Sequence, residues 1–129
     1  MLDRLFGGDR YAAQTHALDA ASLRHQAISN NLANVETPHY KRQEVRFEEQ
    51  LAQALDNKSK FGMGRKGEIG NVRATITRIG DTTSRTDGNN VTMELEAAHL
   101  AENEMKYSVL TQSLGGYYSA LKGVINGGR

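Results

Sequence analysis

The chain has 129 residues, the size of a single domain, and its 16 Lys and Arg against 15 Asp and Glu leave a formal net charge of +1. This near balance does not point to a nucleic-acid partner. The absence of cysteine excludes disulfides, thiol catalysis and Cys-ligated zinc. Only 38% of the residues are hydrophobic and 6% aromatic, so the core is sparse and favours burial against other chains.

The N-terminal stretch MLDRLFGGDR has neither the continuous apolar core nor the small-residue cleavage site of a secretory signal peptide. No segment approaches the roughly 20 apolar residues that are needed to span a bilayer. If the protein leaves the cytoplasm, we expect it to use a route that needs no classical cleaved signal.

The first predicted element is a helix over residues 10–32, within an N-terminal segment that we assign to residues 1–36. Its seam positions step by 3 and 4, as in a coiled coil: Leu18, Ala21, His25, Ile28 and Leu32. Alanine, a strong helix former, fills many of the other positions. Asn34 weakens the helix end and Pro38 forbids its continuation. On this seam we expect His25 to be packed or partly buried.

Residues 37–56 combine a turn motif around Pro38 with a short charged segment. Residues 57–90 are dominated by glycine, charged residues and Ser/Thr, which predicts a variable, loop-rich middle. Within that middle, residues 72–79 are β-branched and partly alternating, so they predict a strand or a strand pair.

The C-terminal segment, residues 91–129, carries the strongest pattern and predicts a coiled-coil helix over residues 92–125. Its seam positions are Met93, Glu96, Leu100, Asn103, Tyr107, Leu110, Leu114, Tyr117, Leu121 and Val124. Such a helix would be about 50 Å long, too long for a compact domain of this size. We expect the two seams to pair within the chain as a hairpin or with other chains.

Two features interrupt the C-terminal seam. Asn103 is either a solvated position near a helix end or a buried polar residue that fixes the helix register. Gly115 and Gly116 cost about 2 kcal/mol relative to two alanines. They are compatible with a local kink or with the close approach of a neighbouring helix.

Candidate chemical motifs are weak. GMGRKG, residues 62–67, matches a dinucleotide-binding pattern but lacks the strand before it and the helix after it, so we predict a flexible loop. Glu96 and His99 have the spacing of a di-iron ligand pair, yet no second such pair fits in one helical turn, and we predict a solvated helix face. We therefore predict no catalytic residue, no metal or cofactor, and neither a nucleic-acid partner nor a small-molecule substrate.

The stretch SNNLANVETPHYKR, residues 29–42, resembles the N-terminal signature of bacterial flagellar rod and hook proteins, in which a helix ends in A-x-N-L-A-N-x-x-T-P-G-Y-x-R. The matching residues are Asn31, Leu32, Ala33, Asn34, Thr37, Pro38, Tyr40 and Arg42. The C-terminal run NNVTMELEAAHLAENEMKY resembles the proximal rod branch of the same family. The matching residues there are Asn90, Val91, Glu96, Leu100, Ala101, Asn103, Lys106 and Tyr107.

This resemblance implies a mainly α fold, in which long N- and C-terminal helices pair as a coiled-coil hairpin and the polar middle has room for a short β element. It implies a structural subunit of the flagellar basal-body rod that joins copies of itself and other rod proteins into a torque-transmitting tube. The implied assembly seam consists of Leu18, Ile28, Leu32, Leu100, Asn103, Tyr107, Leu110, Leu114, Tyr117, Leu121 and Val124. Another short rod subunit, or a helical-hairpin adaptor or secreted binding module, remains an alternative.

Members of this family are exported unfolded through the flagellar type III apparatus, which agrees with the missing signal peptide. Phe47 and Leu51 resemble the Phe-x-x-x-aliphatic element that docks such subunits on the export gate. The alternative for this pair is an i, i+4 apolar contact on a short helix.

One residue departs from the family signature. His39 stands where the family usually has glycine after the proline. Pro then Gly is typical of a type II turn, which needs a positive φ that histidine tolerates less well. We therefore expect a type I turn at this position.

Overall fold

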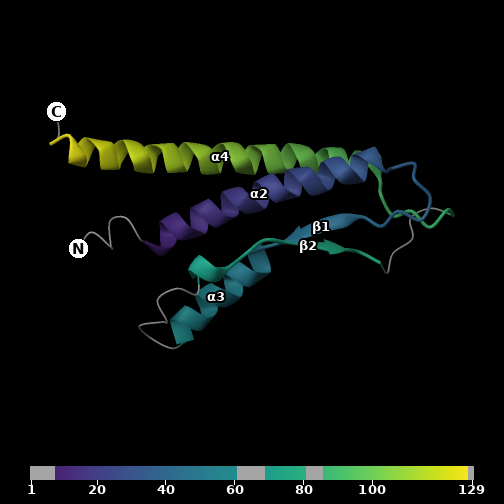
Figure 1. Cartoon of the computed structure of the whole chain (residues 1–129), viewed down its shortest axis with the longest axis horizontal. Coiled ribbons are helices and arrows are strands. Elements are labelled where there is room, and N and C mark those ends of the chain that lie inside the picture. The colour runs from purple at the N-terminus through teal and green to yellow at the C-terminus, as the bar shows by residue number, and fades with distance from the viewer. Residues whose placement is uncertain (1–7, 61–68, 81–85, 128–129) are drawn as a thin grey trace.

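The computed structural model describes residues 8–60, 69–80 and 86–127. In chain order its elements are α2 (Asp9–Ala33), β1 (Gln43–Arg46), α3 (Glu48–Lys60), the 3-10 turn η1 (Ile69–Asn71), β2 (Thr75–Arg78) and α4 (Met93–Ile125). Figure 1 shows α4 and α2 side by side, with α3 and the β1–β2 ribbon on the other side of α2. The mainly helical fold with two long terminal helices and a short β element is confirmed.

The two long helices begin and end close to the predicted residues. At the end of α2, the Asn34 backbone N–H donates to the carbonyl oxygens of Asn30 and Asn31, at 3.2 and 3.1 Å. The Asn34 side chain also donates to Asn30 O at 2.8 Å. At the other helix, Glu94 and Glu96 lie in the first turn and Lys122 in the last, which suits the helix dipole. Neither long helix, within the described residues, is apolar enough to cross a membrane.

The β1–β2 ribbon is antiparallel, with Gln43 opposite Arg78 and Arg46 opposite Thr75. The second strand, β2, lies within the predicted stretch 72–79, whereas β1 falls in the charged segment for which no strand was predicted. In that strand Val45 is 4% exposed. One buried apolar residue between charged neighbours is a weak local signal, and the pairing with β2 is what forms the strand.

The buried apolar cluster lies between α2 and the middle of the chain. Its members are Ala20, Phe47, Ala54, Ile69 and Val72. Alanines on this face of α2 let β1 and η1 approach the helix closely. The helix α3 continues to Lys60, beyond residue 56, where the sequence pattern ended the short segment. The glycine-rich stretch 62–67 lies outside the described residues.

Because α2 packs on two sides, its buried stripe is wider than one heptad seam. Ala21 and Ile28 of the predicted seam are buried, and Leu18 and Leu32 are partly buried. His25 is exposed, so the prediction of a packed histidine is wrong. The buried positions of α2 instead include Ala20, Ala27 and Asn31, which lie beside the predicted seam.

Along α4, most of the predicted seam faces α2 or is partly buried. Glu96, Asn103 and Leu114 are buried, and Leu100, Leu110, Tyr117 and Leu121 are partly buried. Met93, Tyr107 and Val124 are exposed by 54%, 45% and 72%. The helix continues through Gly115 and Gly116, and a Cβ added to either would meet nothing within 4 Å. No close approach inside the described chain therefore requires these glycines.

Candidate functional site: the junction of the terminal segments

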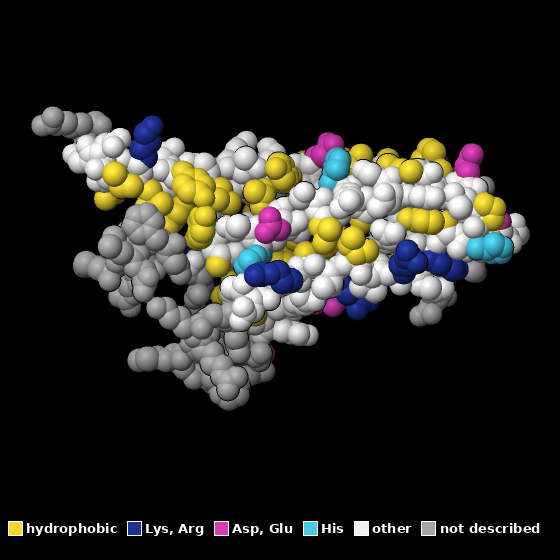
Figure 2. Space-filling view, in the orientation of Figure 1, with side chains coloured by type: hydrophobic (Ala, Val, Ile, Leu, Met, Phe, Trp, Pro, Cys, Tyr) yellow, Lys and Arg dark blue, Asp and Glu magenta, His cyan; other side chains and the backbone are white. Residues whose placement is uncertain are grey.

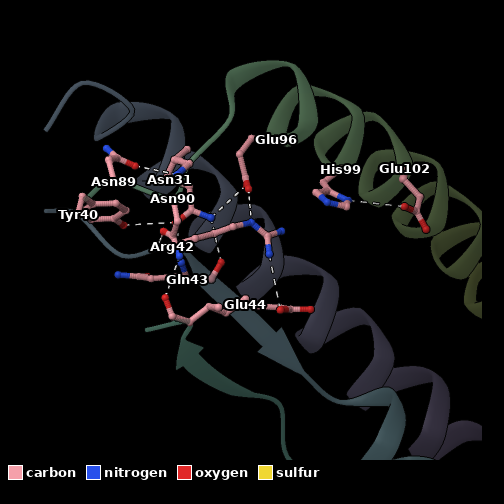
Figure 3. A network of polar contacts seen from close by, with 12 residues as sticks. Asn31, Tyr40, Arg42, Gln43, Glu44, Asn89, Asn90, Glu96, His99 and Glu102 are labelled. Carbon is pink, nitrogen blue, oxygen red and sulfur yellow. Dashed lines mark hydrogen bonds and ion pairs between the residues drawn. The ribbon is translucent and has the colours of Figure 1, made fainter. Parts of the chain in front are cut away.

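Asn31, near the end of α2, joins three elements through one buried side chain (Figure 3). Its Nδ2 donates to Gln43 O at 2.9 Å and to Glu96 Oε2 at 3.0 Å. Its Oδ1 accepts from the Gln43 backbone N–H at 2.8 Å. The amide therefore pairs with the start of β1 as a neighbouring strand would, while it also holds the first turn of α4.

Glu96 is 0% exposed and is held from two sides. One carboxylate oxygen accepts from Asn31, and the other accepts from Nε of Arg42. The Arg42 guanidinium also lies 3.6 Å from Glu44 Oε2. A carboxylate buried to this degree is stable only when it is paired and hydrogen-bonded, and this one is both.

The prediction that Glu96 and His99 lie on a solvated helix face is therefore wrong for Glu96. The reason is that Arg42, which follows the Pro38 turn, brings a cation to this seam position from 54 residues away in sequence. His99 is partly exposed, and its Nδ1 lies 4.0 Å from Glu102 Oε2 on the same helix. The two residues thus point to different partners. Among the described residues, no group of three or more His, Asp or Glu could hold a metal ion.

Asn89 closes the exit of α2. It is 0% exposed, and its Nδ2 group donates to the carbonyl oxygens of Asn34, Val35 and Thr37 at 3.1, 3.0 and 2.9 Å. Its Oδ1 accepts from the Val91 N–H at 2.7 Å. The three carbonyl groups belong to the C-cap residue of α2 and to the turn that follows it, so one buried side chain holds this turn and also shapes the entry to α4.

The Asn90 side chain bonds to both strands of the β1–β2 ribbon at their ends. Its Oδ1 accepts from the Arg42 N–H at 2.6 Å, and its Nδ2 donates to Ile79 O at 2.9 Å. The Ile79 N–H in turn donates to Arg42 O at 2.9 Å. The ladder of β1 and β2 is thereby extended by one side chain, which ties the ribbon to the start of α4.

The turn at Thr37 and Pro38 has a positive φ of 61° at His39, so the expected type I turn is wrong. The Tyr40 N–H donates to Thr37 O at 3.3 Å across this turn. The His39 N–H donates to Asp87 O at 3.1 Å, a contact from the distant turn before α4. At Gly88, whose φ is 80°, an added Cβ would lie 2.9 Å from His39 Nδ1, so the histidine ring occupies the space that a side chain there would need.

Tyr40 lies against the centre of the junction, with its hydroxyl donating to Asn31 Oδ1 at 3.4 Å. Partial burial raises the pKa of the Tyr40 phenol above its ordinary value. Nearby Arg78 lowers this pKa and Glu96 raises it, and both effects are smaller than that of burial. The phenol is therefore neutral at pH 7 and available as a donor.

The structure brings together five residues of the two terminal signatures. Asn31, Tyr40, Arg42, Asn90 and Glu96 form one network, and the Thr37 hydroxyl donates to Asn34 Oδ1 at 3.2 Å beside it. Pro38 and Ala33 are exposed and Leu32 is partly buried. Sequence reasoning missed Asn89 and Gln43 as members. The doubled Asn89-Asn90 before a predicted helix was the available signal for the first, and Gln43 takes part through its backbone alone.

Two further sets of predicted residues lie elsewhere. Phe47 is 3% exposed and packs with the partly buried Leu51 in the core cluster, away from the junction. Asn103 is buried, and its Nδ2 donates to Ala21 O at 2.9 Å, which bears out the buried alternative for this residue. The register-fixing role stays a prediction.

Comparison with known proteins places these signatures in a family. No protein-family model matches the chain. The flagellar basal body rod protein FlgB of Bacillus subtilis is 32% identical over 88% of this chain and 91% of its own length. FlgB of Borrelia hermsii is 34% identical over 84% of this chain and 89% of its own length. The chain belongs to the FlgB family.

FlgB of Yersinia enterocolitica is 29% identical and is matched over 99% of this chain and 100% of its own length. The match thus extends from one terminal signature to the other and includes the middle of the chain. Within this FlgB-family chain, five of the residues that carry the family resemblance, Asn31, Tyr40, Arg42, Asn90 and Glu96, form the network that joins the terminal segments.

Proposed function

We propose that the chain is a structural subunit of the flagellar basal-body rod, in its proximal part, and assembles through its terminal helices. The observation that carries this proposal is the junction of Asn31, Arg42 and Glu96, which ties the exit of α2, the start of β1 and the first turn of α4 into one unit. Directional, buried bonds of this kind resist shear between the two helices. A subunit that transmits torque across the cell envelope needs that resistance.

Exposed apolar residues on α4 support the proposal that the helix pair binds other protein chains. Leu95, Met105 and Val109 are 50%, 64% and 66% exposed. Large exposed apolar side chains on one element are typical of protein-binding surfaces. We propose that copies of this chain and other basal-body rod proteins cover them, with the seam residues of α2 and α4 as the assembly core. Contacts that do not close into a ring extend such an assembly as a helical tube.

We further propose a division of labour along the chain. Residues 1–36 and 91–129 supply the helical core of the tube, residues 37–56 turn the chain from that core outwards, and residues 57–90 form the variable part. This role needs no catalytic residue, cofactor, metal, nucleic acid or small-molecule substrate. The family match does not favour the adaptor alternative.

The export hypothesis follows from the same role. We propose that the subunit reaches the rod through the flagellar type III export gate, without a cleaved signal peptide, and that Phe47 and Leu51 dock on the gate. Because Phe47 is buried in the folded chain, the gate can read it only before folding or after β1 and α3 detach. A Phe47→Ala variant, in a strain whose rod cannot form, should stay in the cytoplasm. Normal export of that variant would remove the docking role.

Complementation in a strain that lacks its own FlgB-family rod protein tests the central proposal. The chain should restore swimming and should be found in purified basal bodies by a label at an exposed position such as Glu49 of α3. The variant Arg42→Met, which breaks the junction, should be expressed but should not restore swimming. The matched variant Arg46→Met, at an exposed position of β1, should swim. Restored swimming with the label absent from the basal body would contradict the proposal.

A further inference from the structure

An apolar groove of about 470 Å³ lies where α2, the start of α3 and the middle of α4 meet. Its floor is the alanine face of α2, which includes Ala17 and Ala20. Phe47 and Leu51 line one wall. Met105 and Val109 line the other, and these two are exposed by 64% and 66%. The groove thus joins a fixed core wall to the most exposed apolar residues in the middle of α4.

A second apolar surface lies at the far end of the same helix. Tyr11, close to the start of α2, packs against Tyr117 and Tyr118 with ring centroids 5.5 and 6.2 Å apart. Residues 121–125 of α4 extend past this contact, and Figure 1 shows the helix end projecting beyond the end of α2. Val124 and Ile125 are 72% and 71% exposed there. Figure 2 shows apolar side chains gathered over this half of α4.

We propose that the groove of one copy of the chain receives the C-terminal end of α4, residues 121–125, from a second copy. This inference rests on the proposed rod function and names the two surfaces that meet. The two surfaces are different, so each copy offers one groove and one helix end. Contacts of this heterologous kind repeat without closing and build an extended assembly.

The dimensions of the two surfaces agree. A core cavity of roughly 150 Å³ is what remains when one large aliphatic side chain is removed. The groove of about 470 Å³ therefore holds about three such side chains. The helix end presents three of them, Leu121, Val124 and Ile125, at the i, i+3, i+4 spacing that places side chains on one face.

The charges agree as well. Of the three charged residues that line the groove, Arg24 and Lys106 are basic and Glu48 is acidic. The C-terminal end of a helix carries a partial negative charge, so a groove with a net basic lining favours this end over an N-terminal one. Val109 and Val124 lie about 22 Å apart along α4, so parallel neighbouring copies would be offset by about that distance.

The absence of cysteine from the chain makes a cross-linking test clean. In purified full-length protein, the double variant Val109→Cys/Val124→Cys should form a ladder of multimers with a short bismaleimide. A mixture of the two single variants should stop at a dimer that contains one of each. The matched control Glu94→Cys/Val124→Cys, with its first cysteine in the exposed first turn of α4, should not form the ladder.

Truncation of the helix end provides an independent measurement. Because Ile125 is exposed in the single chain, Ile125→Ala should leave the thermal unfolding midpoint unchanged. It should weaken self-association in sedimentation velocity by roughly 10- to 100-fold, the effect of losing one buried aliphatic side chain. Unchanged self-association would overturn the proposal.

Other outcomes separate this inference from the rod function. Dimers formed by Val124→Cys alone would show that two helix ends pair with each other. No ladder in pure protein, but a cross-link from Val109→Cys to a different basal-body protein, would show that a partner of another kind fills the groove. Either result overturns self-docking and leaves the complementation result standing, whereas failed complementation would overturn both.

Discussion

At one end of the α2–α4 pair buried polar groups join the helices, and at the other end tyrosines and aliphatic side chains do so. Asn31 and Glu96 meet in a site that is closed to solvent, where each hydrogen bond has a defined direction. Tyr11 and Tyr118 meet at the surface, with their hydroxyls 2.8 Å apart. Directional bonds specify one arrangement within the chain, whereas apolar surface accepts many partners. The difference assigns internal geometry to the junction and assembly to the opposite end.

The strongest test of the junction is the removal of its cation. Arg42→Met would leave Glu96 buried without its charge partner, and breaking such a pair costs roughly 3–5 kcal/mol of unfolding free energy. Urea denaturation followed by circular dichroism measures this change. The surface variant Arg24→Met should cost less than about 1 kcal/mol, because the partner of Arg24, Glu48, is 60% exposed. Similar losses in the two variants would show that the junction is not the stabilising end.

Removal of the central amide should have the next largest effect. Asn31→Ala abolishes the bonds to Gln43 and to Glu96, and a buried group left without a partner costs roughly 1–3 kcal/mol. We expect a loss of about 2–3 kcal/mol, because Glu96 keeps Arg42. Asn30→Ala, at the exposed neighbouring position, is the matched control and should change stability by less than about 0.5 kcal/mol. A loss of unfolding free energy no larger than that of the control would show that the Asn31 side chain does not stabilise the junction.

The contrast between the two ends also explains what the sequence could predict. Both helix spans depend on local signals, namely the heptad spacing, the asparagines at the exit of α2 and Pro38. At the opposite end of the helix pair, Tyr117, Leu121 and Val124 belong to that same spacing. The partners of Glu96 do not, because Asn31 and Arg42 reach it only after the chain has folded back on itself. The solvated Glu96 was a reasonable local expectation that a distant cation overturned.

The sequence predicted neither the turn geometry at His39 nor the strand β1, and the physical reason is the same for both. A histidine with positive φ is locally unfavourable, but the bond from its N–H to Asp87 and the space left by Gly88 hold it in place. The strand β1 has a charged sequence with one buried valine, and its partner strand lies about 30 residues later. Contacts between residues far apart in the sequence determine both the turn and the strand, and the spacing of residues along the chain does not indicate such contacts.

The turn offers a prediction of intermediate size. Gly88→Ala should destabilise the chain by about 1–2 kcal/mol, because alanine resists positive φ and its Cβ would press on the His39 ring. His39→Gly should be neutral or stabilising, since glycine accepts the positive φ without strain. The double variant should recover part of the loss of Gly88→Ala, because the ring that blocks the Cβ is gone. Thermal unfolding of the four proteins gives the coupling, and strictly additive changes would show that the ring and the Cβ do not interact.

The smallest expected effect is an alkaline pH dependence of stability, to which Tyr40 contributes at the junction. Because the pKa of Tyr40 is raised in the folded chain, the neutral phenol is favoured by folding. Its contribution to stability is therefore complete below the unfolded pKa of about 10 and is lost as the pH rises through the higher folded value. Difference curves of the unfolding free energy between wild type and Tyr40→Phe, from pH 8 to 11, should be flat up to about pH 9 and should fall above it. At the opposite end of the α2–α4 pair, Tyr118 also has a raised pKa, chiefly through its hydrogen bond to Tyr11. Tyr118→Phe should remove a second, independent part of the alkaline slope, because the two tyrosines lie at opposite ends of the helix pair. If Tyr40→Phe leaves the alkaline slope intact, the phenol does not sense the buried junction, and its hydrogen bond to Asn31 contributes nothing to the preference for the neutral form.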